Sequence, residues 1–227
     1  MKRTIEIRAA EGGDDSKLFV KDLAQAYIKF AHSKGWATRL INEYLGEVHI
    51  EVQGTDLSGL ENNEPGGHRI QRVPPTERKG RVHTSTVTVA IIDATESQRA
   101  VAIPTIDLKI EWYSGTGAGG QHRNKHQNSC RITHIPTGEV ATAQCRSRQN
   151  SLDMAMTDIQ TRIDNLTKNQ YNNNIANDRR HQVGSGMRGD KIRTYRFQDD
   201  VVKDHNSEKT ASVKKVMAGN FELLWKE

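Results

Sequence analysis

Apolar residues follow two different periods along the chain, and together they predict an α+β fold. Between residues 18 and 30 they recur at helical spacing, and Gly35 is a plausible C-terminal cap. The positions that define this helix are Leu18, Phe19, Leu23, Ala26, Tyr27 and Phe30. Alternation typical of strands is found at residues 3–8, 37–42, 47–52, 69–73 and 83–92.

A second set of elements follows Pro104, which marks a candidate domain boundary. Strands are predicted at residues 106–112, 129–134 and 140–144, and a long helix at 151–180. The glycine-rich stretch 184–189 interrupts the helical pattern as a linker. The last elements predicted are a strand at 192–197 and a short helix at 208–217.

Charge is unevenly distributed along the 227 residues, although the net charge is only +5 and the pI about 9.2. Residues 1–64 hold eight Lys/Arg against eleven Asp/Glu, a net of −3. Residues 65–90 hold five against one, and residues 121–150 again five against one, a net of +4 in each tract. Two separate basic tracts are expected if both contact phosphate backbones.

Cys130 and Cys145 lack the spacing of a metal site, and two cysteines in a chain of this length favour reduced thiols in a cytoplasmic protein. They flank the turn at 136–138 and could face one another across a hairpin. Nine histidines are scattered without a zinc pattern. No apolar run suggests a signal peptide or a membrane span. We therefore expect no metal, no cofactor and no membrane partner.

The glycine-rich stretch at 115–120 is the most informative local feature, with four glycines in six residues followed by Gln121. It does not end in the Gly-Lys-Ser/Thr of a phosphate-binding loop. Glutamine is neither a nucleophile nor a base, but it can place an amide and backbone N–H groups against a reacting ester. A bare Gly-Gly-Gln is more often an ordinary flexible loop, so its surroundings must decide.

Those surroundings resemble a known family. The tract from Ser114 to Gly138 resembles the catalytic domain of class I bacterial peptide chain release factors. Residues 66–77 and 80–85 look like the decoding segment of the branch that reads UAA and UAG. In particular, Pro74-Pro75-Thr76 matches the Pro-x-Thr motif of that branch, where the UAA/UGA branch carries Ser-Pro-Phe. The resemblance extends from about Ile5 to about Leu224.

The resemblance implies a two-unit architecture. A codon-recognition domain would occupy residues 1–104, and an inserted α+β GGQ domain for peptidyl-tRNA hydrolysis would occupy 105–183. Residues 184–190 would be a linker, and 191–227 would pack back on 1–104. Family members usually carry a helical domain before this region, and the chain is expected to lack it.

The resemblance also assigns site residues. The catalytic residues would be Gly119, Gly120 and Gln121, and Gln121 is the position that the family's methyltransferase modifies. Codon recognition would use Gly12, Asp15, Gln71, Pro74, Pro75, Thr76, His83 and Thr84. Contacts with RNA phosphates would come from Arg69, Arg72, Arg123 and Lys125.

More ordinary roles remain open for several of these residues. Asp14 and Asp15 could cap a helix, Thr76 could be a turn residue, and Gln71 could be a polar group on a strand face. The chain also departs from the family, with Asp15 where Glu is usual, Arg123 where Val is usual, and a shorter, less basic tract at 146–153. The last two changes put tight docking of the GGQ domain in doubt.

The leading hypothesis is a translation termination factor for UAA and UAG. It would act as a monomer with both ribosomal subunits, the mRNA stop codon and peptidyl-tRNA, and would promote ester hydrolysis only within the peptidyl transferase centre. One alternative is a codon-independent rescue factor, although the retained Pro74-Pro75-Thr76 and the non-basic C-terminus speak against it. The other is a non-catalytic ribosome- or RNA-binding module. The presence of Gln121 in the Gly-Gly-Gln sequence argues against it.

Overall fold

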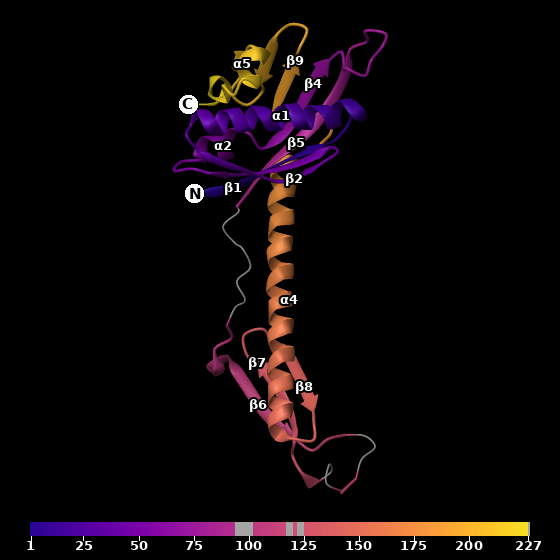
Figure 1. Cartoon of the computed structure of the whole chain (residues 1–227), viewed down its shortest axis with the longest axis vertical. Helices are drawn as coiled ribbons and strands as arrows, with labels where there is room; N and C mark the ends of the chain where they lie inside the picture. The colour runs from indigo at the N-terminus through magenta and orange to yellow at the C-terminus, as the bar shows by residue number, and fades with distance from the viewer. Residues whose placement is uncertain (94–101, 117–119, 122–124, 227) are drawn as a thin grey trace. The chain divides into compact units, whose positions relative to one another are not determined.

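The computed structural model describes residues 1–93, 102–116, 120–121 and 125–226. The chain divides into two compact units (Figure 1). The first unit combines Met1–Ser97 with Ile175–Glu227, and the second is Gln98–Asn174. The first unit is therefore built from two segments that are separated along the chain by the second unit.

An eight-stranded sheet forms the first unit, with strand order β11-β10-β9-β4-β5-β1-β3-β2. Its strands are β1 (Lys2–Ala9), β2 (Ala37–Tyr44), β3 (Glu47–Gln53), β4 (Gly66–Arg72), β5 (His83–Asp93), β9 (Arg193–Arg196), β10 (Val201–Asp204) and β11 (Thr210–Ala211). Its helical segments are α1 (Asp14–Ser33), α2 (Ser58–Asn63), α5 (Val213–Met217) and the 3₁₀ turn η2 (Phe221–Leu224). Every pairing is antiparallel except that of β4 with β9.

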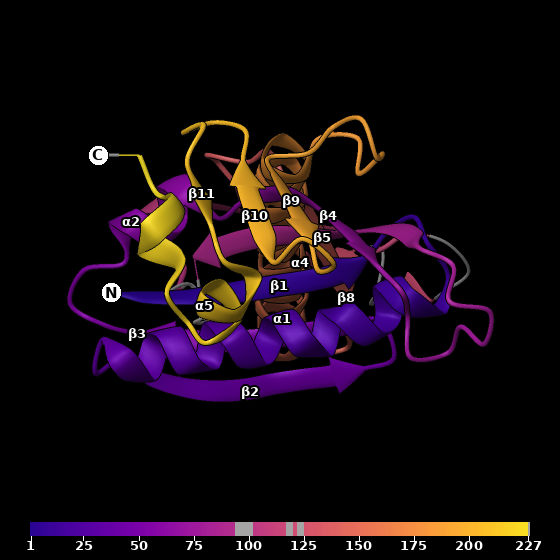
Figure 2. The same cartoon turned by 90° about the horizontal axis from the view of Figure 1, so that it is seen from above.

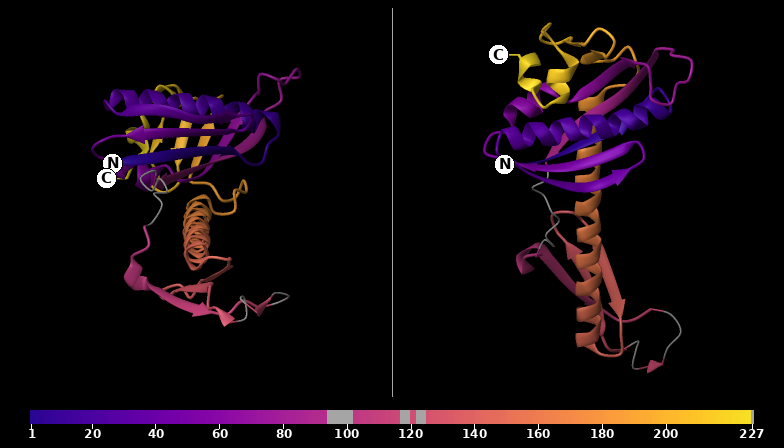
Figure 3. Two further views of the ribbon diagram at one scale, coloured as in Figure 1. Left: turned by 60° about the horizontal axis from the view of Figure 1, so that its bottom comes forward. Right: turned by 45° about the horizontal axis from the view of Figure 1, so that its top comes forward.

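Helix α1 covers one face of this sheet (Figures 1 and 3). Phe19 and Leu23, which the helical period places on one side, are fully buried against strand residues such as Ile5 and Ile7. The helix ends where the sequence predicted, since Gly35 has a φ of +70°. The opposite face of the sheet, which we call the outer face, carries the other set of alternating strand residues.

The last turns of α4 (Arg148–Val183) cover part of the outer face. Arg179 binds the Glu6 carboxylate through two hydrogen bonds of 2.6 and 2.7 Å. The Gln182 side chain bonds both the N–H and the C=O of Ile91. These contacts attach the end of the helix to β1 and β5.

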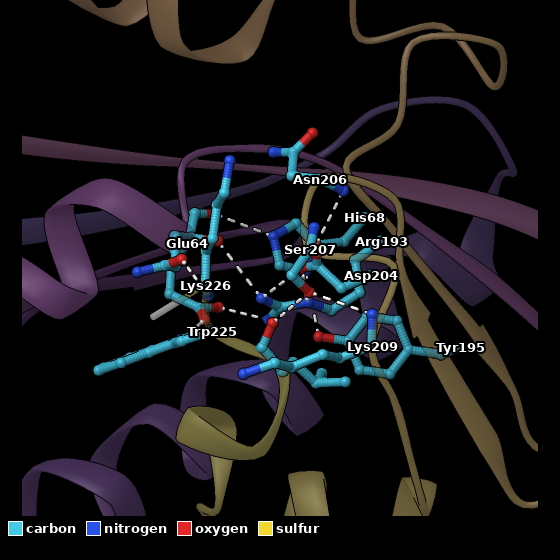
Figure 4. Close-up of polar contacts among 12 residues, drawn as sticks. Glu64, His68, Arg193, Tyr195, Asp204, Asn206, Ser207, Lys209, Trp225 and Lys226 are labelled. Atoms are coloured by element: carbon cyan, nitrogen blue, oxygen red, sulfur yellow. Dashed lines mark hydrogen bonds and ion pairs between the residues drawn. The ribbon is translucent and has the colours of Figure 1, made fainter.

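A buried ionic cluster joins the C-terminal segment to the first half of the unit (Figure 4). Arg193, which is 0% exposed, lies 2.7 Å from Glu64 and 3.0 Å from Asp204. Glu64 also accepts hydrogen bonds from Tyr27 and from the indole of Trp225. Buried charges need such partners, because an unpaired ion in the interior is very costly. Through these contacts the C-terminal segment is joined to Glu64 of the first segment and, through Glu64, to Tyr27.

His68 lies in the same cluster as a neutral ring. Its Nε2 donates to the Glu64 carbonyl, so its Nδ1 accepts from the Tyr195 hydroxyl. Burial, reinforced by the nearby Arg193 charge, lowers the pKa of His68 to about 4. Protonation of Nδ1 would remove the hydrogen bond that this atom accepts from the Tyr195 hydroxyl, and it would place a further positive charge at a site that excludes water.

This lowered pKa predicts an acid-sensitive fold. The unfolded chain, with a histidine pKa near 6.5, binds the proton before the folded chain does as the pH falls. The contribution of neutral His68 to the free energy of unfolding is therefore complete above pH ~7, and it is lost as the pH falls toward 4. We expect the free energy of unfolding to drop by about 2 kcal/mol between pH 7.5 and 5 from this residue alone. Denaturant titrations at both pH values should show that drop in the wild type and not in His68→Gln.

The second unit contains a three-stranded sheet with order β6-β7-β8 and the first part of α4. Its elements are η1 (Thr105–Asp107), β6 (Leu108–Tyr113), β7 (Ser129–His134) and β8 (Val140–Gln144). Ala155, Ile159 and Ile163 recur at helical spacing on α4 and are buried with Cys130 and Ile132 of β7. The sequence predicted both strands of the β7–β8 hairpin at these bounds.

Two predictions about local structure are wrong. The helix expected at 208–217 begins only at Val213, because Thr210 and Ala211 pair with β10 as an additional strand. The two cysteines do not face one another, because Cys130 lies opposite Ala143 in the hairpin. Cys145 follows the end of β8 and both thiols are free.

Candidate functional site

The loop end of the β4–β5 hairpin brings together most of the residues predicted to read the codon. Gln71 lies opposite Thr84, and Arg72 lies opposite His83. The connecting loop, residues 73–82, buries Pro74 and exposes Pro75 and Thr76. A turn closes this loop, since the Glu77 N–H donates to the Pro74 carbonyl at 3.0 Å. The Thr76 hydroxyl is therefore displayed on a short loop whose φ angles are restrained by two prolines.

Glu77 organises this loop, a role that the sequence analysis missed. Its carboxylate accepts hydrogen bonds from the Lys79 N–H, the Arg81 guanidinium and Nε2 of His83. These bonds, led by that from the Lys79 N–H, lower the pKa of Glu77. An ionised Glu77 thus fixes the orientation of the His83 ring. A carboxylate in the middle of a basic tract is the only signal in the sequence for this role.

The structure corrects the expectation for Arg72, which is only 9% exposed. Its Nε donates to Asp15 at 2.7 Å and its Nη1 to Asp22 at 2.8 Å. The guanidinium also lies 5.5 Å from the ring centres of Phe19 and Phe197. With its charge compensated inside the protein, Arg72 holds the end of β4 against α1 and is poorly placed to bind a phosphate.

Asp15 belongs to the same assembly. Its second carboxylate oxygen accepts from the Ser85 hydroxyl at 2.9 Å, and the residue is 3% exposed. Gly13 is the N-cap residue of α1, and no side chain caps that end, so the capping role considered for Asp15 is not found. Asp14 instead pairs with Lys17. Asp15 therefore connects the start of α1 to both strands of the hairpin.

Gly12 packs closely against β5, next to the place where Asp15 connects α1 to the hairpin. Its φ is +128°, and a Cβ added there would lie 2.4 Å from the Ser85 side chain. A side chain at this position would therefore collide with β5 as well as strain the backbone. The close packing leaves the segment before α1 next to the hairpin that carries Gln71 and Thr84.

Of the catalytic residues predicted in the second unit, the structure describes Gly120 and Gln121, and Gly120 borders an open cavity. Gly120 and Gln121 are exposed, as is Lys125. Gly120 borders a cavity of about 620 Å³, which is also lined by Gly115, His126, Asn128, Ser129, Gln144, Cys145 and Arg146. A Cβ added at Gly120 would meet nothing within 4 Å. Among the described residues, therefore, none imposes a steric need for glycine at this position. Gly119 and Arg123 lie outside the described residues.

In the part of the chain that the structure describes, no helix is both long enough and apolar enough to cross a membrane.

The comparisons with known proteins agree with the geometry. The PCRF domain matches residues 1–89 and the RF-1 domain matches residues 95–206. Peptide chain release factor 1 of Albidiferax ferrireducens is 41% identical over 208 residues, which cover 88% of this chain and 57% of that protein. Peptide chain release factor 1 of Malacoplasma penetrans is 40% identical over 224 residues, covering 96% and 62%.

A solved structure gives the same result for the fold. RF2 of Thermus thermophilus superposes with a TM-score of 0.55 at 25% identity, covering 97% of this chain and 65% of that one. The chain thus spans about 60% of the length of the curated relatives that it matches. With both domains present along the chain, the chain belongs to the peptide chain release factors.

Proposed function

We propose that this chain reads UAA and UAG in the ribosomal A site and promotes hydrolysis of the peptidyl-tRNA ester. The observation that carries the proposal is the exposed Thr76 on its restrained loop, beside the paired Gln71 and Thr84, in a chain that also exposes Gln121. The release factor relatives support the same activity.

Codon reading would rest on hydrogen bonding and stacking to single-stranded bases. Thr76 offers one hydroxyl that can donate or accept, on a loop that loses little freedom on binding. His83 offers a ring for stacking, held by Glu77 at 2.9 Å. Gln71 and Thr84 each offer both a donor and an acceptor, which suits a third base that is either A or G.

Hydrolysis would begin with attack of water on the ester carbonyl carbon. The carbon–oxygen bond to the tRNA ribose then breaks, the ribose oxygen takes up a proton, and the peptide leaves as a carboxylic acid. The N–H of Gln121 would stabilise the negative charge on the carbonyl oxygen, and the glycines before it would allow close approach. The Gln121 side chain would limit which nucleophiles enter, and we propose it as a target of N5-methylation.

The experiment is a peptide release assay on ribosomes programmed with UAA, UAG, UGA or a sense codon. We expect release on UAA and UAG alone. Thr76→Ala should lower kcat/KM on both codons by roughly 5- to 150-fold, because an unpaired polar edge costs about 1–3 kcal/mol. Thr76→Ser, which keeps the hydroxyl, is the matched control and should lose much less.

Other outcomes would redirect the proposal. Equal release on stop and sense codons would indicate a codon-independent rescue factor. Ribosome binding without release on any codon would indicate a non-catalytic binding module.

A further inference from the structure

The outer face of the first unit's sheet carries a group of cations that the proposed function does not use. Arg69 shares this face with Gln71, because the two residues are two apart on β4. On β9, which runs parallel to β4, Arg196 lies beside Gln71 and Thr194 lies beside Arg69. Figure 2 shows β4, β9 and β10 as neighbouring strands. On β10, Lys203 lies beside Thr194, and His205 follows the end of the strand.

Side-chain contacts extend this row toward β10. Nε2 of His205 lies 2.9 Å from the Thr194 hydroxyl. Thr194 itself is 2% exposed, so the charged residues around it form the surface at this place. Lys191, which lies two residues before Arg193 at the start of β9, belongs to the same group. We call this group the cationic strip: Arg69, Lys191, Arg196, Lys203 and His205.

Most of this charge is uncompensated. Within the described ranges, no carboxylate lies at ion-pair distance from Arg69, Lys191 or Arg196. Lys203 pairs with Glu208, an exposed contact that solvent screens. The Nε atom of Arg69 is buried and has no hydrogen-bond partner. On the opposite face, by contrast, Arg72 and Arg193 are each bound by two carboxylates.

The positive charges of the cationic strip repel one another. Burial lowers the pKa of Arg69, and the neighbouring Arg196 lowers it further. Burial also lowers the pKa of His205, with additional contributions from Lys191, Lys203 and Arg69. Such repulsion costs stability in the free protein, and a bound polyanion would remove that cost. A row of unpaired cations along neighbouring strands fits a ligand with several phosphates in a line.

We propose that the cationic strip binds phosphates of an RNA strand that lies directly beside the codon. The strip begins next to Gln71 and Thr84, the proposed readers of the third base, and leads away from them across β9 and β10. The C-terminal segment would thereby bind RNA in addition to completing the sheet. The choice of RNA as the polyanion rests on the proposed function; the strip itself rests on the contacts above.

The test uses the triple variant Arg69→Gln, Arg196→Gln, Lys203→Gln and stop-codon ribosomes at increasing salt. Three lost phosphate contacts should reduce the slope of log affinity against log salt by about two units or slightly more. A fourfold rise in salt should then weaken the wild type about 20- to 40-fold more than the variant. The ratio of release on UAA to release on UGA should not change, because phosphate contacts carry no sequence information.

The control is Arg39→Gln, which removes an exposed cation from β2, at the other edge of the same sheet. It should change the salt slope by less than one unit. Because the triple variant removes repulsion, it should unfold at the same denaturant concentration as the wild type or a higher one. A triple variant that folds and keeps the wild-type salt slope would overturn the proposal.

Messages of two lengths separate the two sources of RNA. If the strip binds mRNA, shortening the message to end at the stop codon should remove the difference between variant and wild type. If it binds ribosomal RNA, the difference should persist on both messages. The result is also separable from the proposed function: a salt-slope change without release would refute termination activity alone, and normal release without a slope change would refute the strip alone.

Discussion

Replacing Arg193 with methionine should lower the free energy of unfolding of the first unit by about 3–5 kcal/mol, since it leaves two buried carboxylates without their cation. Glu64 and Asp204 both contact this guanidinium, and all three side chains are almost entirely excluded from water. Methionine roughly fills the volume of the arginine stem, so lost packing would contribute little. Chemical denaturation followed by the fluorescence of Trp36 and Trp225, both packed on the first unit's core, would measure the change.

A compensating variant separates this explanation from a general loss of packing. Adding Glu64→Gln and Asp204→Asn to Arg193→Met removes the orphaned charges and should recover much of the lost stability. Arg39→Met, at an exposed position, should change stability by less than about 0.5 kcal/mol. If Arg193→Met alone costs less than 1 kcal/mol, the buried cluster does not hold the C-terminal segment in place.

The second large effect concerns the N–H of Gln121. Gln121→Pro removes this donor and should lower the rate of peptide release roughly 100- to 1,000-fold, as expected for loss of one oxyanion-stabilising hydrogen bond. Gln121→Ala keeps the N–H and should retain most of the rate of hydrolysis. Release measured at saturating factor on UAA ribosomes distinguishes the two.

Ribosome binding provides the control for this comparison. Gln121 is exposed, and the cations proposed to contact phosphates lie at other positions, so both variants should bind stop-codon ribosomes with near-wild-type affinity. Equal losses of release in the two variants would argue against a role for the backbone N–H. A parallel loss of binding would mean that Gln121 contributes to docking instead of chemistry.

Much of this fold could be predicted because each regular element buries a continuous apolar surface, which is one stripe of a helix or one face of a strand. The helix with Phe19 and Leu23 and the strands with Ile5 and Ile7 show periods that secondary structure alone imposes. The β7–β8 hairpin could be located because a proline and a glycine mark its turn. In such segments, local preference and tertiary burial agree.

The rest depended on long-range contacts that a sequence does not display. Arg72 and Arg193 resemble surface charges in the sequence, yet both are buried by carboxylates distant along the chain. A helix was predicted at 208–217, but Thr210 and Ala211 pair with β10 and therefore belong to the sheet. The motif tracts located the hairpin tip and Gln121. They also contain Glu77 and Ser85, but they did not indicate that these two residues position the neighbouring groups.

The parallel pairing of β4 with β9 has a consequence for vectorial synthesis. Strand β4 is synthesised before the second unit. Its parallel neighbour β9 lies about 125 residues further along the chain, and Arg193, the cation that binds Glu64, lies 129 residues after Glu64. The second unit, whose core is contiguous between residues 108 and 163, can fold in the meantime. Until β9 has been synthesised, the nascent first unit therefore exposes the free edge of β4 and the unpaired carboxylate of Glu64. Such a state favours chaperone binding and disfavours premature closure of the sheet. Completion of this sheet is in this way delayed until the second unit has been synthesised.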